Sequence, residues 1–145
     1  MFNQQTMSIL HSLKLSGMAR SLEERLADPQ QAALSHDDFV ELLVQDEKLY
    51  RDNLRLRRLL KKAKLRQEAA LEDIDYGVSR GLSQQVVMEL ANPQWITACR
   101  NVLISGPTGV GKSFIACALG NAAARAGYTV LYVRCLLYTS PSPRD

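Results

Sequence analysis

The sequence contains little that would support a disulfide-rich, zinc-binding or membrane-spanning protein. Its three cysteines form an odd set without a close pair, and its two histidines lie far from them in the sequence. This spacing argues against a disulfide scaffold and against a recognisable zinc site. The longest strongly apolar stretch, residues 114–124, is too short to cross the ~30 Å of hydrocarbon in a bilayer. We therefore expect no transmembrane helix and no membrane partner.

The N-terminus also lacks the features of a secretory signal peptide. The first twenty residues scatter polar and basic side chains among apolar positions, without a charged segment followed by a compact apolar one. A plain surface helix explains this pattern better than an organelle-targeting helix does. We predict a cytoplasmic protein.

The length and composition are those of about one globular domain. The chain has 145 residues, of which 46% are hydrophobic and 23% are charged. A chain of this length can bury a real core but has little room for two complete ones. Large multidomain machines are therefore excluded as complete objects, and most of the chain should fold.

The first half of the chain is predicted to be helical. Apolar side chains recur three or four residues apart over residues 7–27, although Gly17 weakens this helix or divides it in two. A longer helix is expected over residues 37–68, with Ser35 as its cap and acidic residues at its positive end. The segment that follows is broken by glycine and proline and contains one short helical candidate, residues 83–90.

The longer predicted helix carries a concentration of positive charge. Between residues 47 and 68 nine basic side chains stand against three acidic ones, so this segment sums to +6 while the whole chain sums to +3. At about 100° per residue, five of the basic side chains fall on one narrow stripe. The stripe comprises Arg51, Arg55, Arg58, Lys62 and Arg66, and Leu49, Leu56, Leu60 and Ala63 lie on the opposite side, where we expect packing.

Two interpretations of this stripe are open. Long basic side chains often only keep a helix surface solvated, but such faces normally mix charges of both signs four residues apart. The unbalanced stripe favours contact with nucleic acid or another polyanion, and such contact would weaken with added salt. Aromatic side chains for stacking on unpaired bases are absent apart from Tyr50 at the edge, which favours the backbone of duplex DNA. The predicted DNA-binding residues are Arg51, Arg55, Arg58 and Lys62.

A glycine-rich loop in the second half gives the most specific signal. GPTGVGKS, residues 106–113, matches the pattern G-x-x-x-x-G-K-[ST]. It follows NVLIS, an apolar segment predicted to be a strand at 101–105, and leads into an apolar helix predicted for 112–125. A second predicted strand, TVLYV, follows at 129–133. Because strand, loop, helix and strand occur in this order, a chance match is a poor explanation, and the segment predicts an α/β domain that binds a nucleotide.

Each residue type in the loop suits phosphate binding. Glycines permit backbone conformations in which successive amides point at phosphate oxygens, and the following helix presents its positive N-terminus to the same charge. Lys112 can reach the β and γ phosphates, and the Ser113 hydroxyl can bind Mg²⁺. The predicted nucleotide-binding residues are Gly106, Pro107, Thr108, Gly109, Val110, Gly111, Lys112 and Ser113, with Ser113 also the predicted metal ligand.

Hydrolysis of the nucleotide is a separate question. It needs an acidic residue on a later strand to hold Mg²⁺ and orient water. After Arg134 the chain reads CLLYTSPSPRD, and Asp145 follows no apolar strand. We therefore predict nucleotide affinity with little or no turnover, and no catalytic residue. The prolines forbid continued helix or central strand, so residues 135–145 are expected to be either unrelated coding sequence joined to a truncated frame or a genuine disordered tail.

Several segments together resemble a known protein family. In order, KLSGMARSLEERLADP, RLRRLLKKAKLR, LEDIDYGVSRGL and WITACRNVLISGPTGVGKSFIACALGNAAARAGYTVLYVR resemble the IstB-like ATP-binding proteins. These are helper ATPases of bacterial insertion sequences and are related to the DnaC helicase loader. The resemblance covers about residues 13–134. It implies an AAA+ fold, ATP and Mg²⁺ as ligands, duplex DNA and a transposase as partners, and a homo-oligomer at full length, with the Walker B strand, sensors and arginine finger beyond the segments seen here.

The residues and the resemblance together predict an α/β fold, with a P-loop NTPase (AAA+) core truncated after its second strand and an all-helical N-terminal region before it. Two other functions are open: a DnaC-type helicase loader that binds a replicative helicase, and a nucleotide-independent DNA-binding adaptor with a vestigial P-loop. A small-molecule kinase or GTPase is disfavoured because the basic helix has no role there. The predicted domains are a helical N-terminal domain at 1–70, a connector at 71–100, a partial AAA+ domain at 101–134 and a tail at 135–145.

Overall fold

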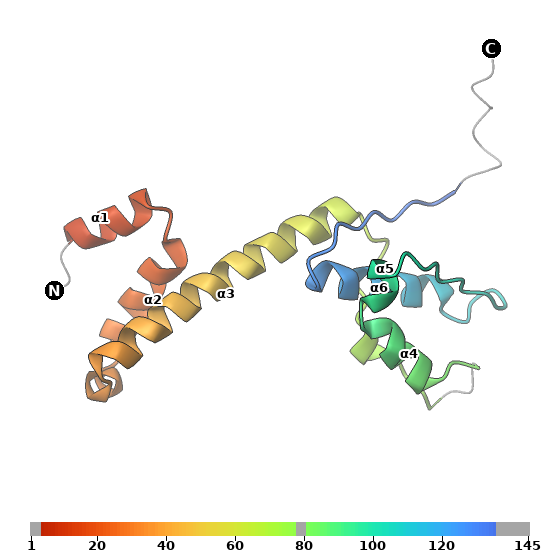
Figure 1. Cartoon of the computed structure of the whole chain (residues 1–145), viewed down its shortest axis with the longest axis horizontal. Coiled ribbons are helices and arrows are strands. Elements are labelled where there is room, and N and C mark those ends of the chain that lie inside the picture. Colours follow the sequence, from red (N-terminus) through yellow and green to blue (C-terminus); the bar gives the residue numbers. More distant parts are fainter. Residues whose placement is uncertain (1–3, 78–80, 136–145) are drawn as a thin grey trace, which may run out of the picture. The chain divides into compact units, whose positions relative to one another are not determined.

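All regular structure in the part of the chain that the structure describes is helical (Figure 1). The computed structural model describes residues 4–77 and 81–135. It divides into two units, Met1–Arg55 and Leu56–Asp145. The elements are α1 (Gln4–Ser12), α2 (Ser16–Leu26), the 3-10 helix η1 (Pro29–Ala33), α3 (His36–Ala63), the 3-10 helix η2 (Leu71–Asp73), α4 (Gln84–Ala91), α5 (Gln94–Thr97) and α6 (Lys112–Arg125).

The segment with the apolar pattern at 7–27 forms two helices, α1 and α2, in agreement with the alternative that it is divided in two. The break falls at Lys14, whose φ of 58° lies in the left-handed region, and not at Gly17. Gly17 instead lies inside α2, where a Cβ atom would approach the Cβ of Tyr50 on α3 to 2.6 Å. The glycine is therefore required by the close approach of the two helices. Ala19 and Leu22 of α2 and Leu43 of α3 form the buried apolar core of this unit.

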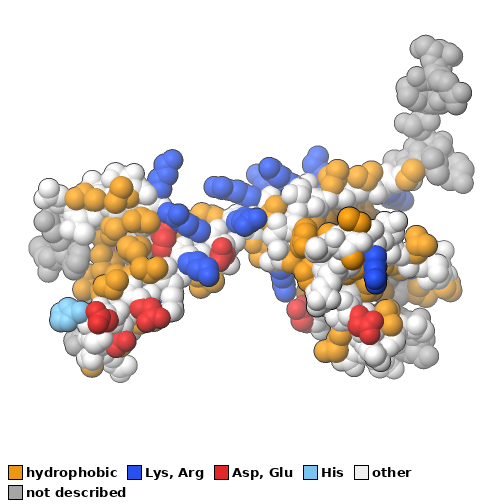
Figure 2. Space-filling view, in the orientation of Figure 1, with side chains coloured by type: hydrophobic (Ala, Val, Ile, Leu, Met, Phe, Trp, Pro, Cys, Tyr) orange, Lys and Arg blue, Asp and Glu red, His pale blue; other side chains and the backbone are white. Residues whose placement is uncertain are grey.

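Helix α3 begins where the sequence predicted. The backbone amide of Asp38 donates to the Ser35 hydroxyl oxygen at 3.1 Å, and that hydroxyl donates to the Asp38 carboxylate at 2.6 Å. This reciprocal cap satisfies a backbone amide that has no partner inside the helix. The helix ends at Ala63, five residues before the expected 68, because Lys64 adopts a left-handed conformation with φ 51°. Figure 2 shows Lys and Arg side chains gathered along α3.

Small residues of α6 form the centre of the second unit. Cys117 and Ala118 are fully buried and pack with Ala69, and Phe114 and Tyr132 lie against this cluster. Helices η2 and α4 both contact α6. The predicted bounds of α6 are confirmed, and α4 lies within one residue of its prediction. Cys117 therefore acts as a small core residue.

The prediction of an α/β fold is wrong for the described chain. Residues 101–105 and 129–133 were expected to be strands, but neither is a strand here. A strand needs a neighbouring extended segment to exchange backbone hydrogen bonds with, and within residues 4–77 and 81–135 none joins these two segments. The Tyr132 amide donates instead to the Ala63 carbonyl at 2.7 Å. Leu103 is 94% exposed and Val133 is 72% exposed, so neither side chain is covered as a core strand requires.

The structure also bears on membrane-spanning helices, metal-binding clusters and disulfides, each of which the sequence argued against. Among the described helices, none combines the length and apolar character needed to span a bilayer. The described residues contain no cluster of side chains suited to hold a metal, and all three cysteines are free. Apart from Cys135, the predicted tail lies outside the described residues.

Candidate functional site

The glycine-rich loop leads directly into α6. Gly111 is the residue before the helix, with φ 102° and ψ 22°, and Gly109 has φ 83°. Both lie in the left-handed region, where a side chain is strained and glycine is not. The loop can therefore turn sharply and bring its backbone to the start of α6. No side chain caps this helix end in the described structure, so the first amides of α6 are available to an anion.

The Lys112 ammonium is held by the loop itself. Its Nζ donates to the carbonyl oxygen of Gly106 at 2.7 Å and to that of Pro107 at 2.5 Å. An ammonium has three donors, so one remains for a further acceptor. The two carbonyls fix a positive charge beside the amides of the helix terminus. This arrangement favours binding of an anion with several oxygens, such as a polyphosphate.

The next residue, Ser113, is half-buried in the first turn of α6. Its hydroxyl makes no hydrogen bond with any residue that the structure describes. The side chain is therefore suited to supply one oxygen ligand to Mg²⁺. Phosphates and waters would supply the other ligands of the octahedron that this ion requires. The described residues contain no cluster of metal-binding side chains, which is compatible with such a site because Mg²⁺ in nucleotide sites is held chiefly by phosphates and few protein ligands.

A cavity of about 360 Å³ lies beside the loop. The connector forms one wall with Ile74 and Leu82, and α6 forms another with Phe114 and Ile115. Lys112 borders the same cavity, so a partly apolar space adjoins the glycine-rich loop. Small-molecule sites are usually of this kind, apolar with a few placed polar groups.

Sequence reasoning missed this wall, because the connector was interpreted only as a link. The acidic residues Asp73 and Asp75 stand exposed on the rim of the cavity. Asp75 shapes the wall, since its Oδ1 accepts a hydrogen bond from the Gly77 amide at 2.8 Å. The signal that could have indicated a packed segment is the alternation of Ile74 and Tyr76 with Asp73 and Asp75 in LEDIDYG.

Four members of the predicted basic stripe lie on α3 and are not equivalent, whereas Arg66 lies beyond the end of the helix at Ala63, so its predicted place on the stripe is wrong. Arg55, Arg58 and Lys62 are exposed and form no ion pair with the residues that the structure describes. Arg51 is engaged: its Nε donates to Glu47 Oε1 at 2.7 Å, and its Nη2 lies 3.4 Å from the Lys14 carbonyl. Three cations of the stripe are therefore available to a polyanion, whereas Arg51 has a structural partner.

That partner, Glu47, is buried and caps α2. Its Oε2 accepts a hydrogen bond from the Met18 amide at 2.8 Å, at a helix start where Leu15 supplies no side-chain cap. Burial raises the pKa of Glu47, but the bonds from Met18 and Arg51 outweigh it, so the pKa lies below its ordinary value. Arg51 thus compensates a buried carboxylate.

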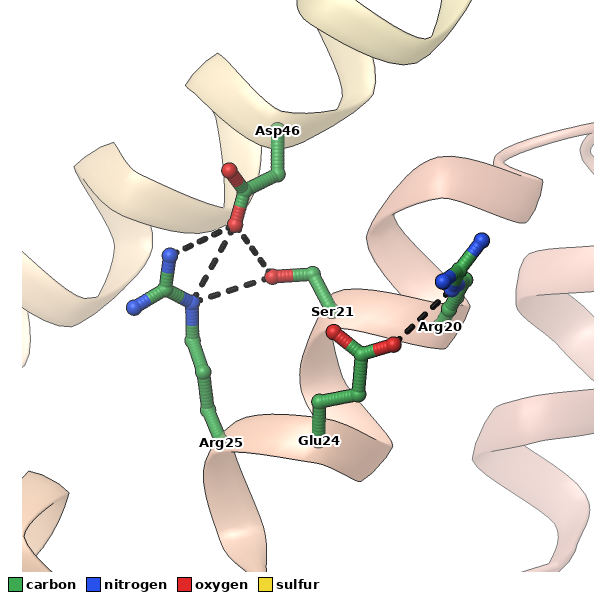
Figure 3. A network of polar contacts seen from close by, with 5 residues as sticks. All are labelled: Arg20, Ser21, Glu24, Arg25 and Asp46. Carbon is green, nitrogen blue, oxygen red and sulfur yellow. Dashed lines mark hydrogen bonds and ion pairs between the residues drawn. The ribbon is translucent and has the colours of Figure 1, made fainter. Parts of the chain in front are cut away.

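A second polar network joins α2 to α3 (Figure 3). Arg25 Nη2 lies 2.6 Å from Asp46 Oδ2, and the Ser21 hydroxyl donates to the same oxygen. The bonds from Ser21 and Arg25 hold the pKa of Asp46 below its ordinary value. Together with Glu47, this network fixes α2 against α3.

The face of α3 opposite the stripe packs only in part. Ala63 is fully buried, and Leu56 and Leu60 are half-buried, as expected. Leu49 is 60% exposed, so the prediction that it packs is wrong. The periodicity placed it on the apolar side, but α2 covers a different part of the helix.

The loop GPTGVGKS, which leads directly into α6, has the sequence typical of P-loop nucleotide-binding proteins, although the segment before it is not a strand in this structure. The family described as IstB-like ATP binding protein matches residues 8–138. A protein of Pseudomonas fluorescens, named as an ATP-binding protein of insertion sequence IS1162, is 47% identical over 135 residues, which cover 92% of this chain and 58% of that protein.

Other relatives carry similar names. An insertion sequence ATP-binding protein of Sinorhizobium fredii is 40% identical over 92% of this chain and 55% of its own length. An ATP-binding protein in an insertion sequence of Mycobacterium tuberculosis is 38% identical over 86% of this chain and 50% of its own length. This chain belongs to the IstB-like ATP-binding protein family, as the resemblance predicted. It spans about half the length of the relatives it matches.

Proposed function

We propose that this chain binds ATP with Mg²⁺ through residues 106–113 and assists a transposase of an insertion sequence by contacting duplex DNA through α3. The single observation that carries the nucleotide part is the Lys112 ammonium, held by two loop carbonyls beside the uncapped start of α6. The names of the relatives, which refer to ATP and to insertion sequences, support the ligand and the context.

The proposed nucleotide occupies two adjoining environments. Its phosphates accept hydrogen bonds from the loop and first-turn amides, and the third N–H of Lys112 binds a phosphate oxygen. The Ser113 hydroxyl binds Mg²⁺, which neutralises phosphate charge. The base lies in the cavity between Ile74 and Leu82 of the connector and Phe114 of α6, where its apolar faces leave water.

Binding without efficient hydrolysis is the proposed behaviour of this chain by itself. Turnover requires an acidic side chain placed to orient water at the γ phosphate. The segment TVLYV at 129–133 carries no acidic residue. Asp73 and Asp75 border the cavity on the connector, where we assign them to its rim and not to the γ phosphate.

The proposed DNA contact uses the three exposed stripe cations on α3 that form no ion pair with the described residues. Arg55, Arg58 and Lys62 follow one another at intervals of three and four residues, so they lie along one stripe of the helix. Such a stripe can bind successive phosphates without reading bases. Arg51 contributes less, because binding a phosphate would draw its guanidinium from the buried Glu47. A helicase loader is the less favoured function, since the named relatives belong to insertion sequences.

Calorimetric titration of the whole chain with Mg-ATP tests the nucleotide proposal. We expect saturable heat from the native chain and a loss of binding in Lys112→Ala. Lys61→Ala removes the same charge from α3 and should bind as the native chain does. Absence of heat from folded native protein, or equal binding by Lys112→Ala, would contradict the proposal.

A further inference from the structure

The connector that forms one wall of the proposed nucleotide cavity also borders a second cavity. Ile74 lines the first cavity, whereas Leu71 and Glu72 line the second, which has a volume of about 460 Å³. Tyr76 lines both. This wall is therefore a single stretch of chain with open space along part of its other side, and its position depends on the contacts that anchor it.

Two contacts anchor the connector to α6. Leu71 packs against the buried cluster of small residues at the centre of the second unit. Glu72 Oε1 accepts a hydrogen bond from Arg125 Nη1 at 3.5 Å, at the C-terminal end of α6. Leu71 and Glu72 belong to η2, which ends at Asp73, directly before Ile74. Both anchors therefore act next to the residue that lines the proposed base site.

The backbone of η2 joins these anchors to Ile74. The Asp73 amide donates to the Ala70 carbonyl at 3.1 Å. The Ile74 amide donates to the Leu71 carbonyl at 3.4 Å. Bonds between residues three apart close a 3-10 turn, so a shift of η2 away from α6 also moves Ile74. Since the loop at 106–113 leads into the same α6, this shift changes the distance between the base wall and the phosphate loop.

We infer that Leu71 and Arg125 are positioning residues that set the affinity of the chain for the base of the nucleotide without touching it. Neither side chain lines the nucleotide cavity. Helix α6 serves both parts of the proposed site, because its first turn presents amides to the phosphates while its middle and its last turn hold the connector. The inference rests on the proposed binding of ATP. It adds that affinity for the base can be lost while affinity for the phosphates is kept.

Loss of stability alone is the other effect that a change at Leu71 could have. A smaller folded fraction weakens the binding of every ligand by the same factor. Displacement of the connector, in contrast, weakens only ligands that carry a base. Inorganic tripolyphosphate has the phosphates of ATP without its nucleoside. The ratio of the affinities for Mg-ATP and magnesium tripolyphosphate therefore separates positioning from stability.

Calorimetric titration of the whole chain with each of these two ligands tests the inference. Leu71→Ala should lower the ratio of ATP affinity to tripolyphosphate affinity about tenfold, the effect of removing roughly 50 Å² of apolar contact with the base. Arg125→Ala should lower the same ratio about twofold, because an exposed ion pair contributes little. Exchange of the two charges, in Glu72→Arg with Arg125→Glu, should restore the native ratio.

The matched controls are Leu119→Ala and Arg100→Ala. Leu119 is a buried leucine of α6 that borders neither of the two cavities, and Arg100 has the charge of Arg125 at another place in the second unit. Both controls should keep the native ratio. The inference is overturned if the native chain binds the two ligands equally, if Leu71→Ala keeps the native ratio, or if Leu119→Ala lowers it as much. Failure of the native chain to bind either ligand would instead overturn the proposed function, and this inference with it.

Discussion

The two units of this molecule complete their cores in different ways. In the first, α2 and α3 are joined by directional contacts, including the Glu47 cap on α2 and the bond between Arg25 and Asp46. In the second, small residues of α6 form the centre, while Leu103 and Val133 remain largely exposed. The first unit thus holds two of its helices together partly through polar side-chain contacts, whereas in the second unit the Lys112 ammonium bonds, among the described residues, only to the carbonyls of its own loop. Changes in the first should alter stability, and changes at the loop should alter ligand binding.

The largest expected effect is on nucleotide affinity. Lys112→Ala removes a charge-assisted hydrogen bond to phosphate, a contribution of about 1.5–3 kcal/mol, or roughly a tenfold to hundredfold loss of affinity. Because the Lys112 side chain bonds only to exposed loop carbonyls, the free energy of unfolding should change little. Calorimetry and chemical denaturation measure the two quantities. A large loss of stability would remove the contrast between the units.

Gly17→Ala should affect the first unit most. The added methyl group would lie 2.6 Å from the Cβ of Tyr50, which cannot move aside without a shift of the helix. We expect a loss of about 1–3 kcal/mol in the free energy of unfolding, measured by urea denaturation with circular dichroism. Mg-ATP affinity should be unchanged under conditions where the variant is folded.

Gly120→Ala offers the corresponding change in the second unit. Its methyl group would meet the flexible end of Leu65 at 3.1 Å and Val130 at 3.3 Å. These side-chain atoms can yield, so the loss should be smaller than for Gly17→Ala. Equal losses in the same denaturation experiment would show that the second unit is packed as tightly as the first.

The salt dependence of DNA affinity should differ between variants on the two sides of α3. Arg58→Ala with Lys62→Ala removes two proposed phosphate contacts and should lower the slope of log affinity against log salt by about 2. Arg57→Ala with Lys61→Ala removes the same charge from outside the stripe and should lower it less. Fluorescence anisotropy of a labelled duplex over a salt series gives both slopes. Identical slopes for the two variants would mean that only net charge matters.

The smallest expected effect is a change in acid stability. The folded-state pKa values of Asp46 and Glu47 lie below their ordinary values, so their ionisation stabilises the fold above those ordinary values. This contribution is lost as the pH falls through the folded-state values. Glu47→Gln should therefore reduce the dependence of stability on pH in the acidic range, as measured by urea denaturation at several pH values. An unchanged dependence in the variant would exclude Glu47 as a cause.

Local sequence signals predicted the features that depend on local chemistry. Ser35 as a cap, the bounds of α6 and the glycine-rich loop all follow from residues close together in the chain. The strands at 101–105 and 129–133 could not be judged in this way, because a strand requires a hydrogen-bonded neighbour that periodicity does not reveal. No local signal predicted that α3 would end at Ala63 either, because the residue after it, Lys64, adopts a left-handed conformation without being a glycine.

In the candidate site, too, local features could be predicted from the sequence and tertiary contacts could not. The proposed phosphate-binding residues could be chosen from the sequence because their motif is contiguous, whereas the connector wall of the cavity depends on tertiary packing. Glu47 and Arg51 have the spacing of a helical ion pair. Burial of Glu47, however, is caused by α2, which the spacing alone could not show. The predicted domain boundaries and the assigned site residues stay predictions.

Hydrogen–deuterium exchange with and without Mg-ATP tests the central claim most directly, because it reports on individual backbone amides. We expect slower exchange at residues 106–113, in the first turn of α6 and along the connector wall near Ile74, with no such protection in Lys112→Ala. Unchanged exchange at residues 106–113 in folded native protein at saturating Mg-ATP would contradict it.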